Sequence, residues 1–292
     1  MSIYDVFYKN EKETENNTFN KEEWARKKQK QRQDAYEMVE STCEKMLSDG
    51  EVLKDYLKVQ GRFDRYSVTN AILVSAQMPE ATKLKEYKKW RADRIYVDKG
   101  ANKVTIFEPG KEYIRDNGTQ AVSYNAKVVY DISETSAKKK AGNEKTYNMR
   151  RLISALIDAS PADFQPVDDL DAPAFYDKEK QIIFVKTGLS EEQLFKAVTK
   201  EISAAIYHVR FNEDREASNF KAYCVAFMTT SKYGIDTGDF NFDKAPEVFD
   251  GLEPQSLKSE LGKIRDVFAE IQTEMYRSLG KNAPVKNREQ ER

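Results

Sequence analysis

The sequence predicts an α+β protein, in which a unit of helices and antiparallel strands precedes a mostly helical unit with a small sheet. Apolar residues recur at helical spacing in several long segments. Between some of these segments, alternating β-branched and aromatic residues flank turns that contain Gly and Asn. The 292 residues, 39% of them hydrophobic, are enough for one large core or two modest ones. We therefore expect two domains.

The first long helix is expected over Lys21–Ser48, where apolar residues return at helical intervals and Gly50 follows the predicted end. Residues 1–20, rich in Asn, Glu and Lys, predict an arm with little fixed structure of its own. The charged surface of the helix, with Lys27, Lys28, Lys30 and Arg32, is expected to be a solvated face rather than a binding site. The apolar positions are Trp24, Ala35, Val39, Cys43, Met46 and Leu47.

The rest of the first domain, predicted to span residues 21–135, alternates short helices with strands. The strands are recognised by alternating β-branched and aromatic residues on either side of a Gly/Asn turn. The predicted elements are helices over residues 71–77 and 87–90, a hairpin of strands 94–97 and 104–107 around a turn at 99–102, and a strand over 126–131.

The second domain is predicted to span residues 149–292. Residues 136–148 lack an apolar period and predict a linker or exposed loop, with the alternative that Lys138-Lys139-Lys140 is a basic finger touching a phosphate backbone. Ser190 and Gln193 form the signature of a capping box. The apolar stripe of the last helix covers only about three heptads and predicts core packing rather than a partner coiled coil. The predicted elements are helices over 149–159, 190–208, 216–232 and 256–279, strands over 174–176 and 181–185, and an acidic loop over 163–171.

Composition excludes several classes of protein. The longest apolar runs are far shorter than the roughly 20 residues that span a bilayer, and the N-terminus lacks a signal-peptide pattern, so we expect a cytoplasmic protein with no membrane partner. Cys43 and Cys224 form no CxxC pair, and we expect both to be small, buried hydrophobic residues. The only histidine is His208, which argues against a histidine-ligated zinc enzyme. We expect neither a cofactor nor a bound metal.

Positive charge is concentrated in one part of the chain. The whole sequence has 48 basic and 49 acidic residues, a net charge of -1 that gives no global nucleic-acid signal. Residues 54–103, however, contain twelve Lys and Arg against six Asp and Glu. Electrostatic binding of a polyanion is therefore expected from this segment.

Several segments of the first domain occur in the same order as in one known family. They are residues 65–82, with Asn70 and the run Gln77-Met78-Pro79-Glu80-Ala81, followed by residues 87–90, 94–100, 104–109 and 128–135. Over these segments the chain resembles the antirestriction proteins of the ArdC type and the related LtrC-like proteins of conjugative plasmids and transposons. The resemblance implies that the first domain is a single-stranded DNA-binding module.

The residues here fit that chemistry independently, because aromatic rings stack on bases of any sequence and interleaved cations follow the backbone. The alternatives are that Trp90 is a core anchor, that Tyr96 faces inward and that Asn70 caps a helix. Predicted contacts are Tyr66, Trp90 and Tyr96 for stacking, Arg65, Lys88, Lys89, Arg91, Arg94, Lys99 and Lys103 for phosphates, and Asn70 and Gln77, seven residues apart on one helix face, for bases or sugars.

The second domain resembles the zincin-type metallopeptidase domain of the same family, on residues 182–185, the helix that starts at Ser190, and residues 222–237. The family helix carries His-Glu-x-x-His, in which two histidines four residues apart bind zinc and the glutamate activates its water. Here the aligned motif reads Lys200-Glu201-Ile202-Ser203-Ala204. A protonated lysine cannot ligate and alanine has no donor, so the resemblance implies a pseudo-metallopeptidase. We expect Glu201 to pair with a cation such as Lys200 or Lys221.

The preferred hypothesis is a non-catalytic counter-defence protein of a mobile genetic element, which opposes a restriction or CRISPR effector. It would bind single-stranded DNA or RNA, a host defence nuclease directly, or both. The alternative is a pure protein-binding module derived from a metallopeptidase. A residual hydrolase is disfavoured, because Glu201 has no metal beside it and Ser203 or Cys224 would depend on His208 alone as a base. The target and the oligomeric state are left open.

Overall fold

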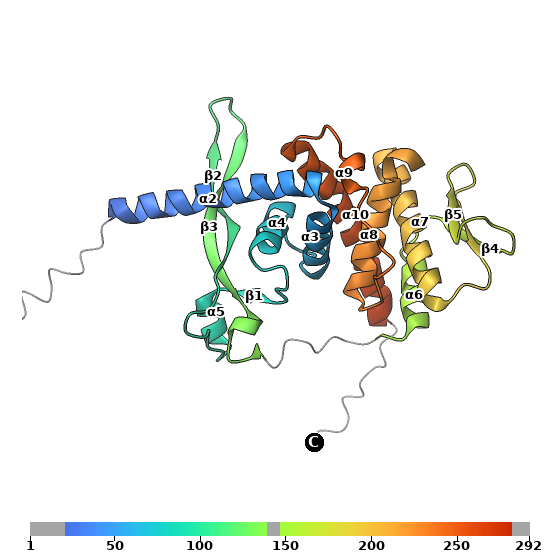
Figure 1. Cartoon of the computed structure of the whole chain (residues 1–292), viewed down its shortest axis with the longest axis horizontal. Coiled ribbons are helices and arrows are strands. Elements are labelled where there is room, and N and C mark those ends of the chain that lie inside the picture. Colours follow the sequence, from blue (N-terminus) through green and yellow to red (C-terminus); the bar gives the residue numbers. More distant parts are fainter. Residues whose placement is uncertain (1–20, 139–146, 282–292) are drawn as a thin grey trace, which may run out of the picture.

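The computed structural model describes residues 21–138 and 147–281 and has an α+β fold, which confirms the predicted fold class. The molecule is elongated (Figure 1). Helix α2 (Lys21–Ser48) extends from one end, and a sheet of β4 (Asp163–Val167), β5 (Ala174–Asp177) and β6 (Ile182–Lys186) lies at the other. No helix within the described ranges is long and apolar enough to cross a membrane.

Helix α2 has the predicted bounds, but only its second half is packed on the core. Ala35 and Cys43 are buried, whereas Trp24 is 51% exposed because the first half of the helix projects beyond the body of the protein. The expectation that Gly50 only follows the helix is incomplete, since Gly50 begins an unpredicted helix, α3 (Gly50–Arg62). Asp49 caps α3 by accepting a hydrogen bond from the Glu51 backbone N–H.

The predicted hairpin is wrong in its partners. Strand β2 (Val104–Ile114) pairs antiparallel with β3 (Gln120–Asp131), and β1 (Leu84–Lys85) pairs with the other edge of β3. Residues 94–97 form no strand beyond a single bridge from Val97 to Thr135, because the chain turns at Arg94, whose φ of 59° is incompatible with an extended strand. The strand expected over residues 126–131 is the last half of β3.

The other two predicted helices of the first half are present, and the first of them begins three residues earlier than predicted. They are α4 (Val68–Gln77), with Ser67 as its N-cap, and α5 (Tyr87–Ala92), and a short 3-10 helix, η1 (Ile132–Glu134), follows β3.

In the second half, β5 and β6 form the predicted antiparallel pair. The expected acidic loop is corrected in its first part, because Asp163–Val167 is the strand β4, parallel to β6. Pro166 is tolerated there because β4 lies at the edge of the sheet. The helices are α6 (Met149–Ile157), α7 (Glu191–Phe211), α8 (Arg215–Lys232), α10 (Pro254–Lys281) and the short, unpredicted α9 (Ala245–Val248).

The core is continuous from one half of the described chain to the other. Buried apolar residues of α2, α3 and α4 belong to the same cluster as those of α7, α8 and α10, and the apolar stripe of α10 is buried in it as predicted. Cys43 and Cys224 are buried and free, and burial raises the pKa of the Cys43 thiol to about 11. The arm of residues 1–20 and most of the 136–148 segment lie outside the described residues, so the division into two domains stays a prediction.

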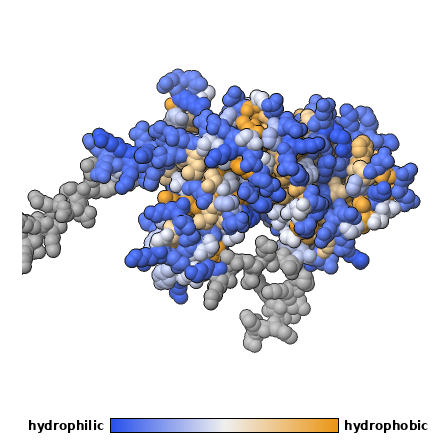
Figure 2. Space-filling view, viewed as in Figure 1, coloured by the Kyte–Doolittle hydropathy of each residue, from blue (hydrophilic) through white to orange (hydrophobic). Residues whose placement is uncertain are grey.

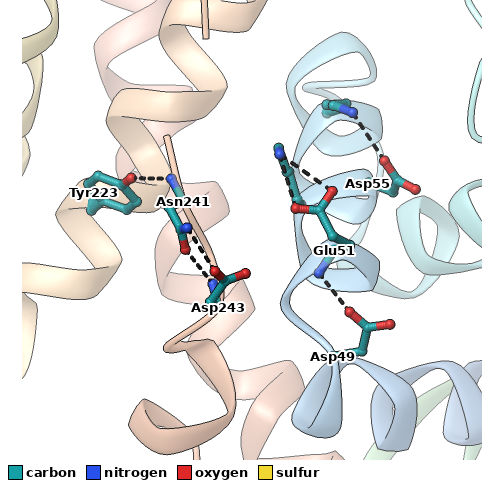
Figure 3. Close-up of polar contacts among 8 residues, drawn as sticks. Asp49, Glu51, Asp55, Tyr223, Asn241 and Asp243 are labelled. Carbon is teal, nitrogen blue, oxygen red and sulfur yellow. Dashed lines mark hydrogen bonds and ion pairs between the residues drawn. The ribbon is translucent and has the colours of Figure 1, made fainter. Parts of the chain in front are cut away.

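Helix α3 starts unusually close to the loop that follows α8. A Cβ atom on Gly50 would lie 2.0 Å from the Phe242 carbonyl oxygen, so only glycine fits at this contact. Hydrogen bonds hold this loop beside α3 (Figure 3). The Asn241 backbone N–H donates to the Tyr223 hydroxyl at 2.7 Å, and the Asn241 side-chain oxygen accepts from the Asp243 N–H at 2.7 Å.

We predict that Gly50→Ala lowers the free energy of unfolding by about 1–3 kcal/mol or more, because the added methyl group would overlap a backbone carbonyl of a loop held by hydrogen bonds. Gly262→Ala is the matched control. Gly262 lies in α10 with no atom within 4 Å of an added Cβ, and alanine in a helix interior is favoured over glycine by about 1 kcal/mol. Urea titrations of the three proteins give the comparison. Equal effects of the two substitutions would contradict the close contact.

Candidate functional site

A pocket of about 410 Å³ lies where the altered metallopeptidase motif was predicted. It is bounded by the end of β5, the second half of α7 and the start of α8. Of the segments on which the predicted resemblance to a zincin rests, only α7 lines it. Its lining includes Phe175, Tyr176, Asp177, Lys178, Ala204, His208, Glu213, Asp214, Arg215, Glu216 and Ser218.

Glu201 lies beside this pocket and is 3% exposed. Its Oε2 atom accepts a hydrogen bond of 2.8 Å from the Tyr176 backbone N–H and forms a close ion pair with Nη2 of Arg215. The Arg215 guanidinium also stacks on the Phe175 ring, with 4.4 Å between its central carbon and the ring centroid. A buried carboxylate needs a compensating cation, and the N-terminus of α8 supplies it.

The two lysines expected to pair with Glu201 do not do so. Lys221 is buried and bonds to Glu213 and Glu260 instead, at 2.5 and 2.8 Å. Lys200 is half-buried, and its burial lowers its pKa, an effect that the Glu201 carboxylate opposes. The prediction that Glu201 forms an ion pair is therefore confirmed, but the predicted partners are wrong, because the cation is Arg215. Arg215 was not recognised, because nothing in the sequence places residue 215 over residue 201.

The residues at this site do not fit a zinc ion. Ala204 is buried and offers no donor, and the Arg215 guanidinium occupies the carboxylate face of Glu201. Within residues 21–138 and 147–281, no group of three or more His, Cys, Asp and Glu side chains is placed to hold a metal. Ser203 and His208, the possible nucleophile and its base, bond to other groups instead of to each other. The Ser203 hydroxyl donates to the Thr199 carbonyl at 2.7 Å, and Nδ1 of His208 lies 3.1 Å from the Tyr176 hydroxyl.

Most of the predicted phosphate contacts lie on one small lobe, which is formed by α5, the loop of residues 93–103 and η1. The lobe is built around a separate apolar cluster of Trp90, Ile132 and Ala137. Its outer loop is fastened to η1, where the Asn102 side-chain NH2 donates to Glu134 at 2.8 Å. We call it the α5 lobe. The exposed predicted residues on it are Lys88, Lys89, Arg91, Arg94, Tyr96, Lys99 and Lys103, and Arg65 is exposed outside it, between α3 and α4.

The cations of the α5 lobe are largely free of carboxylate partners. Lys89 pairs with Glu86 at 3.0 Å. Tyr87 and Tyr96, 48% and 61% exposed, stand among these cations. No ion pair to a residue in the described ranges is formed by Lys88, Arg91, Arg94, Lys99 or Lys103.

Two of the predicted stacking residues have structural roles. Trp90 is fully buried, and its indole N–H donates to the Tyr130 carbonyl at 2.9 Å. Tyr66 is half-buried, packs on Phe63 with 5.0 Å between ring centroids, and has its pKa raised by burial. The structure therefore gives Trp90 the core position that was the alternative interpretation, and it leaves Tyr96 exposed.

The amides of Asn70 and Gln77 hold strand β2. Asn70 donates to the Phe107 carbonyl at 2.9 Å and accepts from the Phe107 N–H at 2.7 Å. Gln77 donates to the Thr105 carbonyl at 2.9 Å and accepts from the Thr105 N–H at 2.8 Å. Together the two side chains satisfy the edge of β2 that faces away from β3. We call this arrangement the amide clamp.

Sequence analysis missed the aromatic residues at the other end of the sheet. The β2–β3 hairpin is longer than predicted, and its outer part carries the exposed side chains Tyr113 and Tyr124. Tyr36, on α2, is also exposed and lies against Phe107 at 4.5 Å between ring centroids. The available signal was the alternation of residues 119–125, but it does not reveal which helix lies beside the hairpin.

No protein-family model matches the chain, and no curated protein matches it. Among solved structures, it is similar to the metal-free crystal structure of the antirestriction protein ArdC from plasmid R388, with a TM-score of 0.52 at 15% identity, over 73% of this chain and 86% of that one. The Mn(II)-bound structure of the same protein gives a TM-score of 0.47 at 16% identity, over 76% and 86%. The first likeness confirms the fold that the resemblance implied.

For the buried ion pair, we predict that Arg215→Ala lowers the free energy of unfolding by about 2 kcal/mol. This is less than the 3–5 kcal/mol typical of breaking a buried pair, because the Arg215 side chain is 40% exposed. Adding Glu201→Gln to Arg215→Ala should restore part of the loss, since no uncompensated charge remains. A double-mutant cycle measures this coupling. Arg150→Ala, which breaks an exposed pair with Glu191, is the control and should change stability by less than about 0.5 kcal/mol. Additive effects at 201 and 215 would refute the coupling.

For the amide clamp, we predict that Gln77→Ala lowers the free energy of unfolding by about 1–3 kcal/mol, because both backbone groups of Thr105 lose their partner. Ser75→Ala in the same helix is the control, since its hydroxyl bonds only to the Ile72 carbonyl of α4. Thermal and urea unfolding give both values. If Gln77→Ala is as stable as Ser75→Ala, solvent replaces the clamp and β2 does not depend on it.

Proposed function

We propose that this protein is a non-catalytic counter-defence protein of a mobile genetic element and that it acts by binding single-stranded nucleic acid. The α5 lobe carries this proposal, since it presents five cations without carboxylate partners in the described chain, beside the exposed rings of Tyr87 and Tyr96. Cations that follow a backbone and rings that accept bases of any sequence are the two requirements for such binding.

The proposed contact residues are fewer than those predicted from the sequence. The side chains of Trp90, Asn70 and Gln77 are already hydrogen-bonded within the protein, to the backbone carbonyls of Tyr130, Phe107 and Thr105. We therefore propose that they support the binding surface rather than touch the ligand. The proposed contacts are Lys88, Lys89, Arg91, Arg94, Tyr96, Lys99 and Lys103, with Tyr87 added, while Arg65 would form a separate contact between α3 and α4.

The zincin-like half is proposed to be a scaffold without peptidase activity. Zinc hydrolases need an ion with an open coordination position. Here Glu201 is neutralised by Arg215, and the positions four residues apart are Lys200 and Ala204. Support for antirestriction as the biological role comes from the fold shared with an antirestriction protein of a plasmid. A restriction nuclease or a CRISPR effector is the proposed class of target.

The second candidate function is a protein-binding module without nucleic-acid affinity. The pocket beside Glu201 favours it, because Phe175 is 39% exposed there although it is a large apolar side chain. A pull-down from host lysate, with and without nuclease treatment, separates the candidates. A defence nuclease retained after nuclease treatment favours direct protein binding, whereas its loss favours a nucleic-acid bridge.

We predict that the full chain binds a fluorescently labelled single strand and that affinity falls steeply with salt. The variant Lys88→Ala/Arg91→Ala/Lys99→Ala should reduce the slope of log affinity against log salt by about 2, because each phosphate contact on a single strand contributes about 0.7. DNA and RNA strands are titrated in parallel by fluorescence anisotropy.

The matched control removes three exposed lysines from the other half of the chain, in Lys178→Ala/Lys180→Ala/Lys244→Ala. It should bind like the parent protein. Absence of binding at low salt would rule out the proposed function, and equal losses in the two triple variants would show that net charge alone is responsible.

A further inference from the structure

At the opposite end of the sheet from the α5 lobe, the β2–β3 hairpin crosses α2 (Figure 1). Two hollows, of about 690 and 470 Å³, lie between the hairpin and the projecting half of the helix. Both are lined by Gln29 and Arg32, so they adjoin. We call them together the α2–hairpin groove.

Helix α2 presents a regular stripe of side chains to this groove. Trp24, Lys28, Arg32 and Tyr36 follow one another at four-residue intervals. Residues at this spacing lie on one face of a helix, about 6 Å apart along its axis. The stripe therefore places an aromatic ring at each end and two cations between them. All four residues line one of the two hollows.

The projecting half of α2 carries uncompensated positive charge. Between Glu22 and Gln33 there are five cations and two carboxylates, and Figure 2 shows hydrophilic side chains along this part of the helix. Elsewhere in the protein, cations such as Lys127 and Lys221 have acidic partners. A strip of this kind attracts a polyanion. None of Arg26, Lys27, Lys28, Lys30 and Arg32 forms an ion pair with a residue that the structure describes.

The tyrosine rings in the groove are accessible, and one of them is supported by a neighbouring ring. Tyr36 rests on Phe107 and is still 47% exposed, so one side of its ring is supported and the other is open. Tyr113 and Tyr124 line the same hollow from the hairpin and are 49% and 45% exposed. Exposed rings of this number in one hollow are unusual for a surface that meets only water.

Of the three acidic side chains that line the groove, Glu108 and Glu37 have partners within the protein, and Glu40 forms no ion pair with a described residue. Glu108 pairs with Lys127 at 2.5 Å, and Glu37 accepts a hydrogen bond from Gln33 at 2.9 Å. The cations therefore lie toward Trp24 and the acidic residues toward the Tyr36 end. A bound chain would run its phosphates past Lys28 and Arg32 and present bases to the tyrosines.

We propose that the α2–hairpin groove is a base-stacking site for single-stranded nucleic acid, an inference that rests on the proposed function and places it at a second surface. Bases stack on Tyr36, Tyr113 and Tyr124, while phosphates lie along Lys28 and Arg32. Single strands are favoured over duplexes, because a duplex hides the base faces that aromatic side chains contact. An extended acidic peptide would satisfy the cations but leave the three rings without a matching partner.

Trp24 provides a direct readout of occupancy. The chain has two tryptophans, and Trp90 is fully buried in the α5 lobe, so quenching of tryptophan fluorescence by a bound strand reports on Trp24. A single-stranded oligonucleotide is titrated into the full-length protein at low salt. We expect quenching that saturates with the anisotropy signal, and no quenching in Trp24→Phe. Binding without any quenching would overturn the groove as the site.

Tyrosine variants test the stacking itself. Tyr113→Ala/Tyr124→Ala should weaken binding by about 10-fold or more, and Tyr113→Phe/Tyr124→Phe should retain affinity within about 2-fold, because the ring rather than the hydroxyl stacks. Tyr276→Ala, an exposed tyrosine of α10 far along the chain, is the matched control and should bind like the parent protein.

The outcomes separate the two proposals. If the parent protein binds no oligonucleotide, both fail. If it binds, and only the Lys88/Arg91/Lys99 variant is weakened while the tyrosine variants are not, the proposed function stands and the groove is overturned. Equal affinity for duplex and single strand would also overturn stacking. Capture of an acidic peptide by the groove with no strand binding would assign it to a protein partner instead.

Discussion

Helix α3 packs against α8 so closely that the rest of the structure is arranged around this contact. Gly50 leaves no room for a side chain beside Phe242, and an added Cβ on Gly61 would lie 3.3 Å from the Met228 carbonyl oxygen. Lys232, at the end of α8, closes the contact by donating to the Gly61 carbonyl at 3.0 Å and pairing with Asp64 at 3.0 Å. The position of α3 then sets that of α4, whose amides hold β2, and β2 carries the hairpin over α2. A surface at one end of the molecule is thus fixed by a helix contact at its centre.

The ion pair between Glu201 and Arg215 is a second consequence of where α8 begins. A carboxylate that is only 3% exposed is costly without a compensating charge. Asp214 caps α8 and fixes the start of the helix, so the next residue, Arg215, extends between Phe175 and Glu201. The Arg215 guanidinium therefore neutralises the Glu201 carboxylate, donates a hydrogen bond to it in addition to that of the Tyr176 N–H, and stacks on the Phe175 ring. The pocket beside Glu201 therefore has a guanidinium on its carboxylate and no donor at Ala204.

Local patterns in the sequence were sufficient for most of the helices, although α3 and α9 were not predicted. The bounds of α2, the capping box of Ser190 and the buried stripe of α10 follow from periodicity and capping chemistry, which depend only on neighbouring residues. The partner of β2 and the partner of Glu201 could not be predicted, because both are contacts between distant parts of the chain. The pairing of β2 with residues 94–97 was the wrong choice for this reason. Arg94 turns the chain with a positive φ, a conformation that arginine rarely adopts and that the sequence therefore does not predict.

Asn70 and Gln77 show why residue type alone is a weak guide to a binding surface. An amide can read a base or sugar, but it can equally complete the hydrogen bonds of a strand edge, and both uses favour the same spacing along a helix. The structure distinguishes these uses, because a polar group that is already hydrogen-bonded within the protein is not available to a ligand. Asn70, Gln77, Trp90 and Glu201 are satisfied within the protein, whereas Lys88, Arg91, Lys28 and Arg32 form no ion pair with the described chain. Since cations without an ion pair within the described chain are available to attract phosphate, the binding surfaces that we propose lie at the two ends of the β2–β3 ribbon and not at the pocket beside Glu201.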